Sequence, residues 1–248
     1  MPIIIDVIIL SYAKNSALKK LTEQTVASCL NSENPAEITF NIVVIESYQG
    51  LEPFQFGNTR TIYPTVKFGF HRYLNIGIKN TVHDYICFCN NDLIFHKGWA
   101  NEILKAMTQN PRLLCCNPFC DNFHRDKAQY YNEDINYGYD NGIYFTGWCF
   151  LVKRSIFDLT GFFDEKFEFW FSDDDFRLTL KKNNLANALV VKSKVTHLRS
   201  ETLNKTDKKK QKHLQYSSFA YYKYKWEHHN PLKYFIEILK YKFKVYIS

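Results

Sequence analysis

The stretch 85–92 reads Tyr-Ile-Cys-Phe-Cys-Asn-Asn-Asp, five uncharged, mostly apolar residues followed at once by polar ones that end in a carboxylate. Such a run predicts a strand covered on both faces, as in the interior of a parallel sheet. Open α/β sheets bind their ligands outside the carboxyl ends of the strands. Oxygen ligands at that position suit Mg²⁺ or Mn²⁺ bound to a diphosphate. The stretch therefore predicts a buried strand that brings Asp92 to a ligand site.

Two further apolar runs, Ile3–Leu10 and Ile38–Ile45, alternate with helical patterns in the first half of the chain. This alternation predicts a doubly wound sheet of mainly parallel strands. The first run ends at Ser11 and the second at Glu46. Because parallel strands end at the same edge of a sheet, we expect Ser11, Glu46 and Asp92 to converge there.

A second group of acidic residues follows an aromatic run at 167–171. Asp173, Asp174 and Asp175 open a predicted helix that extends to Lys182. Acidic residues interact favourably with the dipole at the start of a helix, so capping explains one or two of them. Three acidic residues are more than capping requires. A carboxylate can also act as a base and take the proton from an acceptor hydroxyl. We therefore expect one of the three to act as a general base.

The composition indicates a globular protein with one main domain and an appendage. The chain has 248 residues, of which 46% are hydrophobic and 17% aromatic, and this excludes a disordered chain. The seven cysteines lack the spacing of a disulfide framework, so we expect free thiols. No apolar stretch is long enough to span a membrane, and the start lacks the features of a signal peptide. We therefore expect a cytoplasmic protein.

Positive charge is concentrated toward the carboxyl end. The whole chain carries a formal charge of +7, whereas residues 192–248 hold 14 Lys and Arg against 4 Asp and Glu. The last predicted helix places an apolar stripe beside lysines, and the stripe consists of Leu232, Phe235, Ile236 and Leu239. Three interpretations stay open. The helix docks on an anionic membrane, its lysines bind DNA phosphates, or its stripe packs on the domain while the lysines face water.

Several segments occur in the order seen in one enzyme family. They are Ile8–Tyr12, Val43–Ser47, Gly69–Ile78, Asn90–Asp92, Thr146–Arg154, Gly161–Glu165, Asp173–Asp175 and His197. Together they resemble the family 2 glycosyltransferases, and among these the rhamnosyltransferase-like branch, over about residues 3 to 200. The resemblance implies the GT-A fold, a Rossmann-like, nucleotide-sugar-binding α/β fold with a mainly parallel central sheet, here with a C-terminal helical extension.

The resemblance also implies a division of the chain and a reaction. It implies a GT-A domain at 1–200, with a nucleotide-sugar-binding half at 1–120 and an acceptor-side half at 121–200. Residues 201–248 are then a basic mobile loop and two C-terminal helices. The implied reaction moves a sugar from a nucleotide-diphosphate sugar to an acceptor hydroxyl, with inversion at the anomeric carbon.

Residue roles follow from the same resemblance. It assigns contacts with the nucleotide sugar to Ser11, Tyr12, Glu46, Arg72, Asn75, Asn91 and Asp92. It assigns a divalent cation, Mn²⁺ or Mg²⁺, to Asp92 and His197. Asp173 is the expected general base, and Asp175 is the other catalytic candidate. The acceptor and sugar pocket is expected to include Gly147, Trp148, Trp170 and Asp174.

The sequence departs from the family pattern at three positions. Glu46 replaces the usual aspartate, the DxD metal motif is reduced to Asp92, and Ser172 stands where the family often has glutamate. The reduced metal motif keeps open a second class of function, a non-catalytic nucleotide- or glycan-binding module. The carboxylates at 173–175 favour the enzyme.

The acceptor has two interpretations. The first is a glycan or lipid-linked saccharide, with the basic helix in peripheral contact with the inner face of a membrane. The alternative is duplex DNA, with the chain acting as a phage-type DNA glycosyltransferase on a hydroxymethylated base, so that the basic segment follows phosphates.

Overall fold

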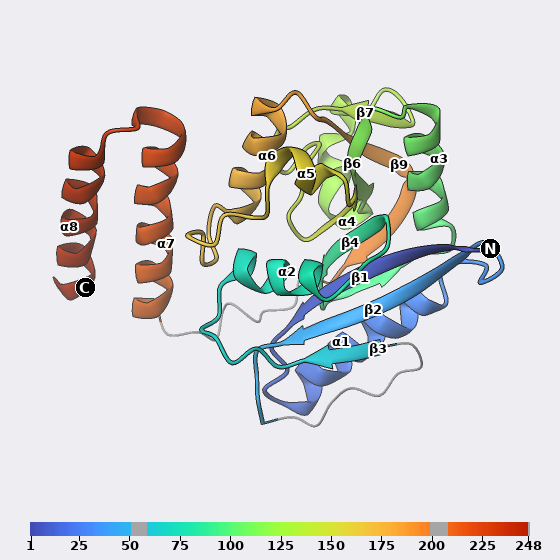
Figure 1. Cartoon of the computed structure of the whole chain (residues 1–248), viewed down its shortest axis with the longest axis horizontal. Helices are drawn as coiled ribbons and strands as arrows, with labels where there is room; N and C mark the ends of the chain where they lie inside the picture. Colours follow the sequence, from blue (N-terminus) through green and yellow to red (C-terminus); the bar gives the residue numbers. More distant parts are fainter. Residues whose placement is uncertain (51–58, 199–207, 248) are drawn as a thin grey trace.

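The strands of the described residues form one nine-stranded sheet at the centre of the molecule, with helices on both of its faces (Figure 1). The structure, a computed structural model, describes residues 1–50, 59–198 and 208–247. The strands are β1 (Ile3–Ser11), β2 (Ile38–Glu46), β3 (Thr59–Ile62), β4 (Tyr85–Asn90), β5 (Leu93–Phe95), β6 (Leu113–Phe119), β7 (Ile135–Tyr137), β8 (Cys149–Lys153) and β9 (Ala186–His197). Their order across the sheet is β3-β2-β1-β4-β8-β6-β9-β5, and β7 pairs with β9.

The part of the sheet formed by β3, β2, β1 and β4 is parallel, as the strand–helix alternation predicts. Its register places Ser11 beside Glu46 and Leu10 beside Asn90, so three strand ends lie at one edge. The rest is mixed, because β8 runs antiparallel between β4 and β6 while β6 and β9 are parallel. The predicted α/β fold with a mainly parallel sheet is therefore confirmed, with antiparallel pairs that the sequence did not indicate.

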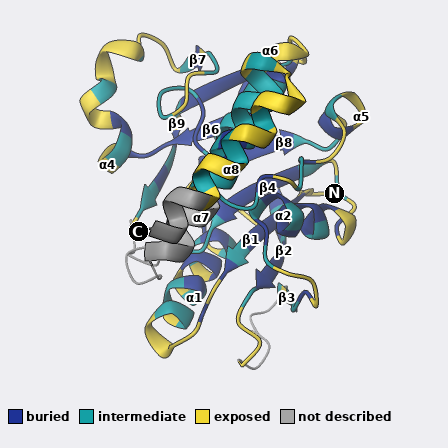
Figure 2. Ribbon diagram, turned by 90° about the vertical axis from the view of Figure 1, so that its left-hand side faces the viewer, coloured by how far each residue is buried: buried dark blue, intermediate teal, exposed yellow. Residues whose placement is uncertain are grey.

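Helices cover both faces of the sheet and enclose two apolar cores. They are α1 (Ser16–Leu30), α2 (Phe70–Lys79), α3 (Trp99–Gln109), α4 (Asp121–His124), α5 (Ile156–Thr160), α6 (Ser172–Lys182), α7 (Lys208–Lys223) and α8 (Pro231–Ile247), with a 3₁₀ segment η1 (Arg125–Tyr130) and a π-helical turn η2 (Tyr224–His228). One core receives Val26 from α1 and Trp99 from α3. The other receives Leu74 from α2 and Phe176 from α6. The buried strands between these layers are visible in Figure 2.

A glycine sets how closely α2 approaches the sheet. A Cβ on Gly77 would lie 2.5 Å from Ile8 Cγ2, a separation that real Cβ atoms do not show. Helix α2 therefore packs directly on β1 only because residue 77 has no side chain. This contact fixes the position of Arg72 and Asn75, which lie on the same helix.

The sequence also predicts a long polar loop at 121–142, a strand at 144–153 and a mobile polar loop at 203–212, and these three local predictions were wrong. Residues 121–142, expected to form a loop, contain α4, η1 and β7. The strand expected from Tyr144 begins only at Cys149, because the side chain of Asn117, not a neighbouring strand, donates to the carbonyl of Thr146. Residues 208–212, expected in the mobile loop, belong to α7, since lysine and glutamine are good helix formers. The remainder of that expected loop, 203–207, lies outside the described residues.

Helices α7 and α8 form a hairpin beside the domain, shown in red in Figure 1 and in front of the sheet in Figure 2. The interpretation that the α8 stripe packs on the domain is wrong. The exposed fractions are 67% for Leu232, 59% for Phe235, 42% for Ile236 and 50% for Leu239. The stripe faces outward because α8 packs on α7 through its tyrosines. No helix within the described residues is long and apolar enough to cross a bilayer.

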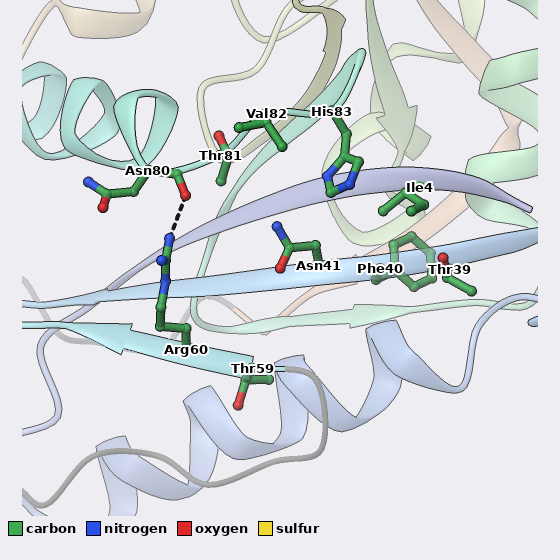
Figure 3. Close-up of a pocket in the computed structure, with 10 residues that line it drawn as sticks. All are labelled: Ile4, Thr39, Phe40, Asn41, Thr59, Arg60, Asn80, Thr81, Val82 and His83. Atoms are coloured by element: carbon green, nitrogen blue, oxygen red, sulfur yellow. Dashed lines mark hydrogen bonds between the residues drawn. The ribbon is translucent and has the colours of Figure 1, made fainter.

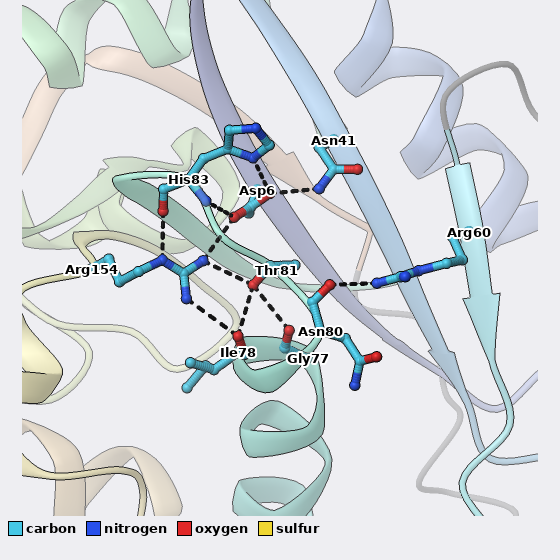
Figure 4. Close-up of polar contacts among 9 residues, drawn as sticks. All are labelled: Asp6, Asn41, Arg60, Gly77, Ile78, Asn80, Thr81, His83 and Arg154. Carbon is cyan, nitrogen blue, oxygen red and sulfur yellow. Dashed lines mark hydrogen bonds and ion pairs between the residues drawn. The ribbon is translucent and has the colours of Figure 1, made fainter.

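At the amino-terminal edge of the sheet, one buried carboxylate joins several segments (Figure 4). Asp6 is fully buried, and its oxygens form hydrogen bonds of 2.6–2.8 Å with the side chains of Asn41, His83 and Arg154. Arg154 also donates to the carbonyls of Ile78 and His83. Burial favours the neutral acid, but the hydrogen bonds from His83 and Asn41 outweigh it and lower the pKa of Asp6. The network ties β1 to β2, to the loop after α2 and to the end of β8.

We expect Arg154→Met to lower the free energy of unfolding by about 3–5 kcal/mol at neutral pH, because it leaves the Asp6 carboxylate buried without its cation. Since the folded-state pKa of Asp6 is depressed, its contribution is present above the unfolded pKa of about 3.9 and is lost as the pH falls through the folded pKa. The difference in the free energy of unfolding between the parent and Arg154→Met should therefore be smaller at acidic pH. Urea denaturation of both proteins at neutral and acidic pH measures this difference. Arg112→Met, at an exposed position, is the control, and equal costs for the two variants would contradict the prediction.

Candidate functional site

A hydroxyl on α1 joins the ends of β1 and β4. Ser11 Oγ lies 2.9 Å from Thr22 Oγ1, and the side-chain amide of Asn91 donates to the same hydroxyl at 3.0 Å. Glu46 lies beside Ser11 in the sheet register. The structure therefore brings Ser11, Glu46 and the turn that carries Asp92 to one edge of the sheet.

Glu46, at the end of β2, is fully buried. Its Oε1 accepts hydrogen bonds from the backbone N–H groups of Ala13 at 3.1 Å and Tyr48 at 2.7 Å. Its Oε2 is buried and has no hydrogen-bond partner among the described residues. Close by, the exposed rings of Tyr12 and Tyr48 meet edge to face, with centroids 6.1 Å apart. Because an unsatisfied buried acceptor costs free energy, Oε2 is suited to an N–H or O–H donor of a ligand.

Asp92 and His197 are the candidate cation ligands. Nε2 of His197 lies 3.3 Å from Asp92 Oδ1, and the imidazole stacks on Trp148 with ring centroids 5.2 Å apart. Within the described ranges, no cluster of three or more His, Cys, Asp or Glu side chains could hold a metal. One carboxylate and one imidazole form an incomplete donor set. They fit a Mn²⁺ or Mg²⁺ ion whose remaining ligands are diphosphate oxygens and water.

Asp173 lies in the first turn of α6 and packs against Gly147. A Cβ on Gly147 would lie 2.7 Å from Asp173 Cβ, so the approach requires glycine. Asn141 donates to Asp173 Oδ2 at 3.1 Å. Burial, and next the charge of Asp174, raise the pKa of Asp173 above its ordinary value. A carboxylate with a raised pKa is a stronger base, and perturbed pKa values are typical of active sites.

The other two aspartates of this helix pair with cations. Asp174 Oδ1 lies 2.7 Å from the Arg177 guanidinium. Asp175 is 3% exposed, and its Oδ1 lies 2.8 Å from Lys225 Nζ. Burial raises the pKa of Asp175, and Lys225 opposes this. In the part of the chain that the structure describes, Asp173 is thus the one aspartate of the three without an ion-pair partner.

Lys225 fastens the C-terminal hairpin to both acidic segments. Its Nζ lies 2.8 Å from Asp164 Oδ2 as well as from Asp175 Oδ1. Trp226 donates its indole N–H to the same oxygen of Asp175, and Tyr221 donates its hydroxyl to the same oxygen of Asp164, each at 2.8 Å. Lys225 and Trp226 belong to the π-helical turn η2, a geometry that is frequent at functional sites. These contacts fasten the hairpin to the segment before α6 and to the first turn of α6.

The residue before α6 has a strained backbone. Phe171 has φ 64°, in the left-handed region that bulky residues rarely adopt. Its ring lies 5.3 Å from that of Phe219 and 5.1 Å from that of Tyr222, measured between centroids. Packing against α7 therefore helps to hold a backbone turn that aims Asp173 toward Gly147.

Arg72 and Asn75 lie against a different segment from Asp92. Arg72 Nε pairs with Glu165 Oε2 at 3.1 Å. The amide of Asn75 donates to the carbonyl of Phe163 at 2.9 Å and to Glu165 Oε1 at 3.1 Å. The structure does not bring these two residues together with Asp92, and their contact with a nucleotide sugar stays a prediction.

The two tryptophans predicted for the sugar pocket differ in exposure. Trp148 is 9% exposed and is covered by Phe123, His124 and His197, so it forms a buried wall. Trp170 is 36% exposed and is therefore accessible to a ligand.

A cavity of about 520 Å³ lies at the opposite edge of the sheet (Figure 3). It is lined by the first residues of β1 and β2 and by Asn80–His83. Its Arg60 donates to the carbonyl of Asn80, and its Asn41 and His83 bind Asp6. These side chains stabilise the fold, and none of the predicted site residues lines the cavity.

With this geometry established, the class of protein follows. The fold is that of the GT-A glycosyltransferases, as solved structures of that class show by similarity. The family described as Glycosyl transferase family 2 matches residues 6–161, more than half of the chain. The chain therefore belongs to glycosyl transferase family 2. No curated protein matches the sequence.

Three solved structures resemble the chain at low sequence identity. GalNAc-T7 with UDP, GalNAc and Mn²⁺ has a TM-score of 0.62 and 12% identity, and the match covers 79% of this chain and 44% of that one. The mannosyltransferase PcManGT from Pyrobaculum calidifontis, in complex with GDP-Man and Mn²⁺, has a TM-score of 0.60, 12% identity and coverages of 98% and 70%. TarS 1–349 of S. aureus has a TM-score of 0.58, 13% identity and coverages of 93% and 74%. The chain spans less than half of GalNAc-T7.

Sequence reasoning missed several residues of the site. Thr22 lies mid-helix, where nothing marks it as the link between Ser11 and Asn91. Asn141 lies in a polar segment that has no periodicity. Lys225 is one lysine among many in the basic end of the chain, and its contacts are with residues at least 50 positions away. The aromatic residues around it, Tyr221, Tyr222, Tyr224 and Trp226, are the one sequence signal that could have indicated a packed position.

We expect Lys225→Met to loosen the hairpin, because it leaves two carboxylates without their shared cation. Cleavage within α7 and α8 should become at least about tenfold faster than in the parent, since proteolysis tracks the population of the locally opened form. Limited proteolysis with mass spectrometry of the fragments measures this. Lys240→Met, at an exposed position of α8, is the matched control. Equal cleavage rates in the parent and in Lys225→Met would show that the ion pairs do not fasten the hairpin.

Proposed function

We propose that this protein transfers a sugar from a nucleotide-diphosphate sugar to an acceptor hydroxyl. One chain of contacts carries the proposal. Asp92 lies against His197, His197 stacks on Trp148, and the neighbouring Gly147 packs on Asp173. The candidate cation ligands and the candidate base are thus held on two sides of one short segment, as a transfer between a diphosphate donor and a hydroxyl requires.

The nucleotide sugar would lie along the ends of β1, β2 and β4. The free oxygen of Glu46 would accept a hydrogen bond from the nucleoside, beside the Tyr12 ring, and Ser11 and Asn91 would line the path to the diphosphate. We retain Arg72 and Asn75 as donor ligands, although their present contacts are with residues 163–165. Asp92 and His197 would hold Mn²⁺ or Mg²⁺. When bound, this ion offsets the charge on the leaving diphosphate.

Asp173 would act as the general base. It accepts the proton of the acceptor hydroxyl as that oxygen bonds to the anomeric carbon, while the bond between this carbon and the diphosphate oxygen breaks. Attack from the face opposite the diphosphate inverts the anomeric centre. The raised pKa of Asp173 and its lack of an ion-pair partner among the described residues support this role over Asp175, which we assign to holding the hairpin. Gly147, Trp148, Trp170 and Asp174 would line the acceptor and sugar pocket.

For the acceptor we propose a glycan or a lipid-linked saccharide, handled by residues 121–200, while residues 1–120 bind the donor. A hexosyl or pentosyl donor and a rhamnosyltransferase-like branch are compatible with this assignment, as is a cytoplasmic protein in peripheral contact with a membrane. Transfer to a hydroxymethylated base in duplex DNA is a second candidate, and the surplus of lysines after residue 192 supports it. A non-catalytic binding module has less support, because Asp173 is positioned and its pKa is raised.

We expect Asp92→Ala to abolish manganese-dependent binding of the nucleotide sugar without unfolding the protein. A screen of nucleotide sugars by thermal denaturation, with and without Mn²⁺, identifies the donor, because a ligand that binds only the folded state raises its stability. The variant should lose the shift that depends on Mn²⁺. Asp158→Ala, at an exposed position on α5, is the control. An unchanged manganese-dependent shift in Asp92→Ala would remove Asp92 from the site.

We expect Asp173→Asn to lower the rate of transfer at least about 10²-fold while donor binding persists, since the amide keeps the shape and loses the basicity. Because the pKa of Asp173 is raised, its basic form appears at higher pH than for an exposed aspartate. The parent rate should therefore rise with pH through that pKa, and the variant should lack this rise. Initial rates across pH measure both effects. If Asp175→Asn removes activity and Asp173→Asn does not, the base is misassigned.

A further inference from the structure

The outward face of α8 is an exposed apolar stripe. Leu232, Phe235, Ile236 and Leu239 stand at spacings i, i+3, i+4 and i+7, which places them on one side of the helix. Their exposed fractions run from 42% to 67%. Several large apolar side chains on one exposed helical face are typical of a site that contacts another body.

Contacts with α7 and η2 hold this face outward. Tyr241 stacks on Tyr216 with ring planes 2° apart and centroids 4.9 Å apart. Tyr234 packs on Tyr224 at 5.1 Å, and Glu237 pairs with Lys223 at 3.0 Å. Helix α7 lies beside α8 (Figure 1) and, with η2, occupies its polar and aromatic side, while the side chains of the stripe are exposed.

Lysines border the stripe and have no acidic neighbour on that face. At about 3.6 residues per turn, Lys233 and Lys240 border it on one side and Lys242 on the other, and all three are exposed. The acidic residue of α8, Glu237, lies on the inward side with Lys223 and His228. Along 231–242 the outward face therefore combines apolar side chains and cations without an anion.

We infer that this face docks on a membrane that contains anionic lipid. A bilayer surface receives the apolar stripe below its headgroups while the lysines extend to the lipid phosphates. A second copy of the helix would place lysines opposite lysines, because the face has no acidic side chain to pair with them. Duplex DNA would contact the lysines and leave four large apolar side chains in water. Of these three partners, the bilayer is the one that satisfies both parts of the face.

This inference rests on the proposed function and narrows its acceptor class. Lys225 and Trp226 tie the same hairpin to Asp175, two residues from the proposed base. A hairpin docked on a bilayer therefore holds α6 near the lipid surface. An acceptor anchored in that bilayer would be presented to Asp173, which favours a lipid-linked saccharide over a free glycan.

Flotation of the full chain with vesicles tests the inference. The probes are phosphatidylcholine vesicles and vesicles of phosphatidylcholine with phosphatidylglycerol, at low and at physiological salt. We expect binding to the anionic vesicles that weakens as salt rises. Lys233→Gln with Lys240→Gln should lower the partition coefficient about 30-fold, from about 1 kcal/mol for each lysine. Phe235→Ser with Ile236→Ser should lower it at least about tenfold.

A matched control distinguishes docking through α8 from nonspecific binding of vesicles by exposed apolar side chains. Val82→Ser with Leu159→Ser removes two other exposed apolar side chains, at positions 80% and 57% exposed, and should leave vesicle binding unchanged. No vesicle binding, together with dimers in sedimentation that Phe235→Ser with Ile236→Ser dissociates, would overturn the inference in favour of a second copy. A salt-sensitive shift of duplex DNA that only the lysine variant loses would overturn it in favour of nucleic acid.

Failure of docking and failure of the proposed function give different results. The stripe and its lysines do not line the donor site, so the nucleotide-sugar shift in thermal denaturation should be the same in these variants as in the parent. A parent that shows the donor shift but floats with neither kind of vesicle disproves docking alone. If the parent floats with anionic vesicles and no nucleotide sugar shifts its thermal denaturation, the proposed function is disproved. The inference that the hairpin docks on a membrane then still holds.

Discussion

The parallel register of β2, β1 and β4 is the constraint on which the site depends. It sets Ser11 beside Glu46 and Leu10 beside Asn90, so side chains far apart in sequence share one edge. A slip of one residue would turn each side chain of a strand to the other face. Ile8 would then lose its contact with α2, and the strand ends would separate. Burial on both faces specifies this register strongly, which is why the edge can carry a fully buried Glu46.

The fold was largely predictable where burial dictates the sequence. Ile3–Leu10 and Tyr85–Cys89 are apolar on both faces because helices cover both sides of their sheet. The direction of β8 was not predictable, since it depends on partners such as Phe88, which pairs with Phe150 across the antiparallel ladder. A local pattern indicates that a strand exists and does not indicate its direction. The prediction that the apolar stripe of α8 packs on the domain was wrong for a similar reason. The tyrosines of α8 pack on the preceding helical segment, and this contact between distant residues decides which side of α8 faces outward.

The candidate site was predictable where a carboxylate follows a regular element. Asp92 lies in the turn that follows buried strand β4, and Asp173 lies in the first turn of α6, after an aromatic run. Contacts between residues far apart in the chain have no signal in the local sequence. The bond from Asn141 to Asp173 and the clamp from Lys225 on Asp164 exist only after distant segments meet. The hydrophobic pattern therefore predicts where the candidate carboxylates lie along the chain, and tertiary contacts decide which of the three aspartates of α6 lacks an ion-pair partner among the described residues.

The π-helical turn at Tyr224–His228 sets the helical phase of the hairpin. Before it, Phe219 packs on Phe171, and within it Lys225 and Trp226 reach Asp175. A deletion of one residue there would restore α-helical geometry and rotate the following residues by about 100°. Both contacts with Asp175 would then be lost while Phe219 kept its place. In an alignment of homologous chains, the turn, the lysine and the tryptophan should therefore covary as a unit, and the carboxylate at position 175 should change wherever they are absent.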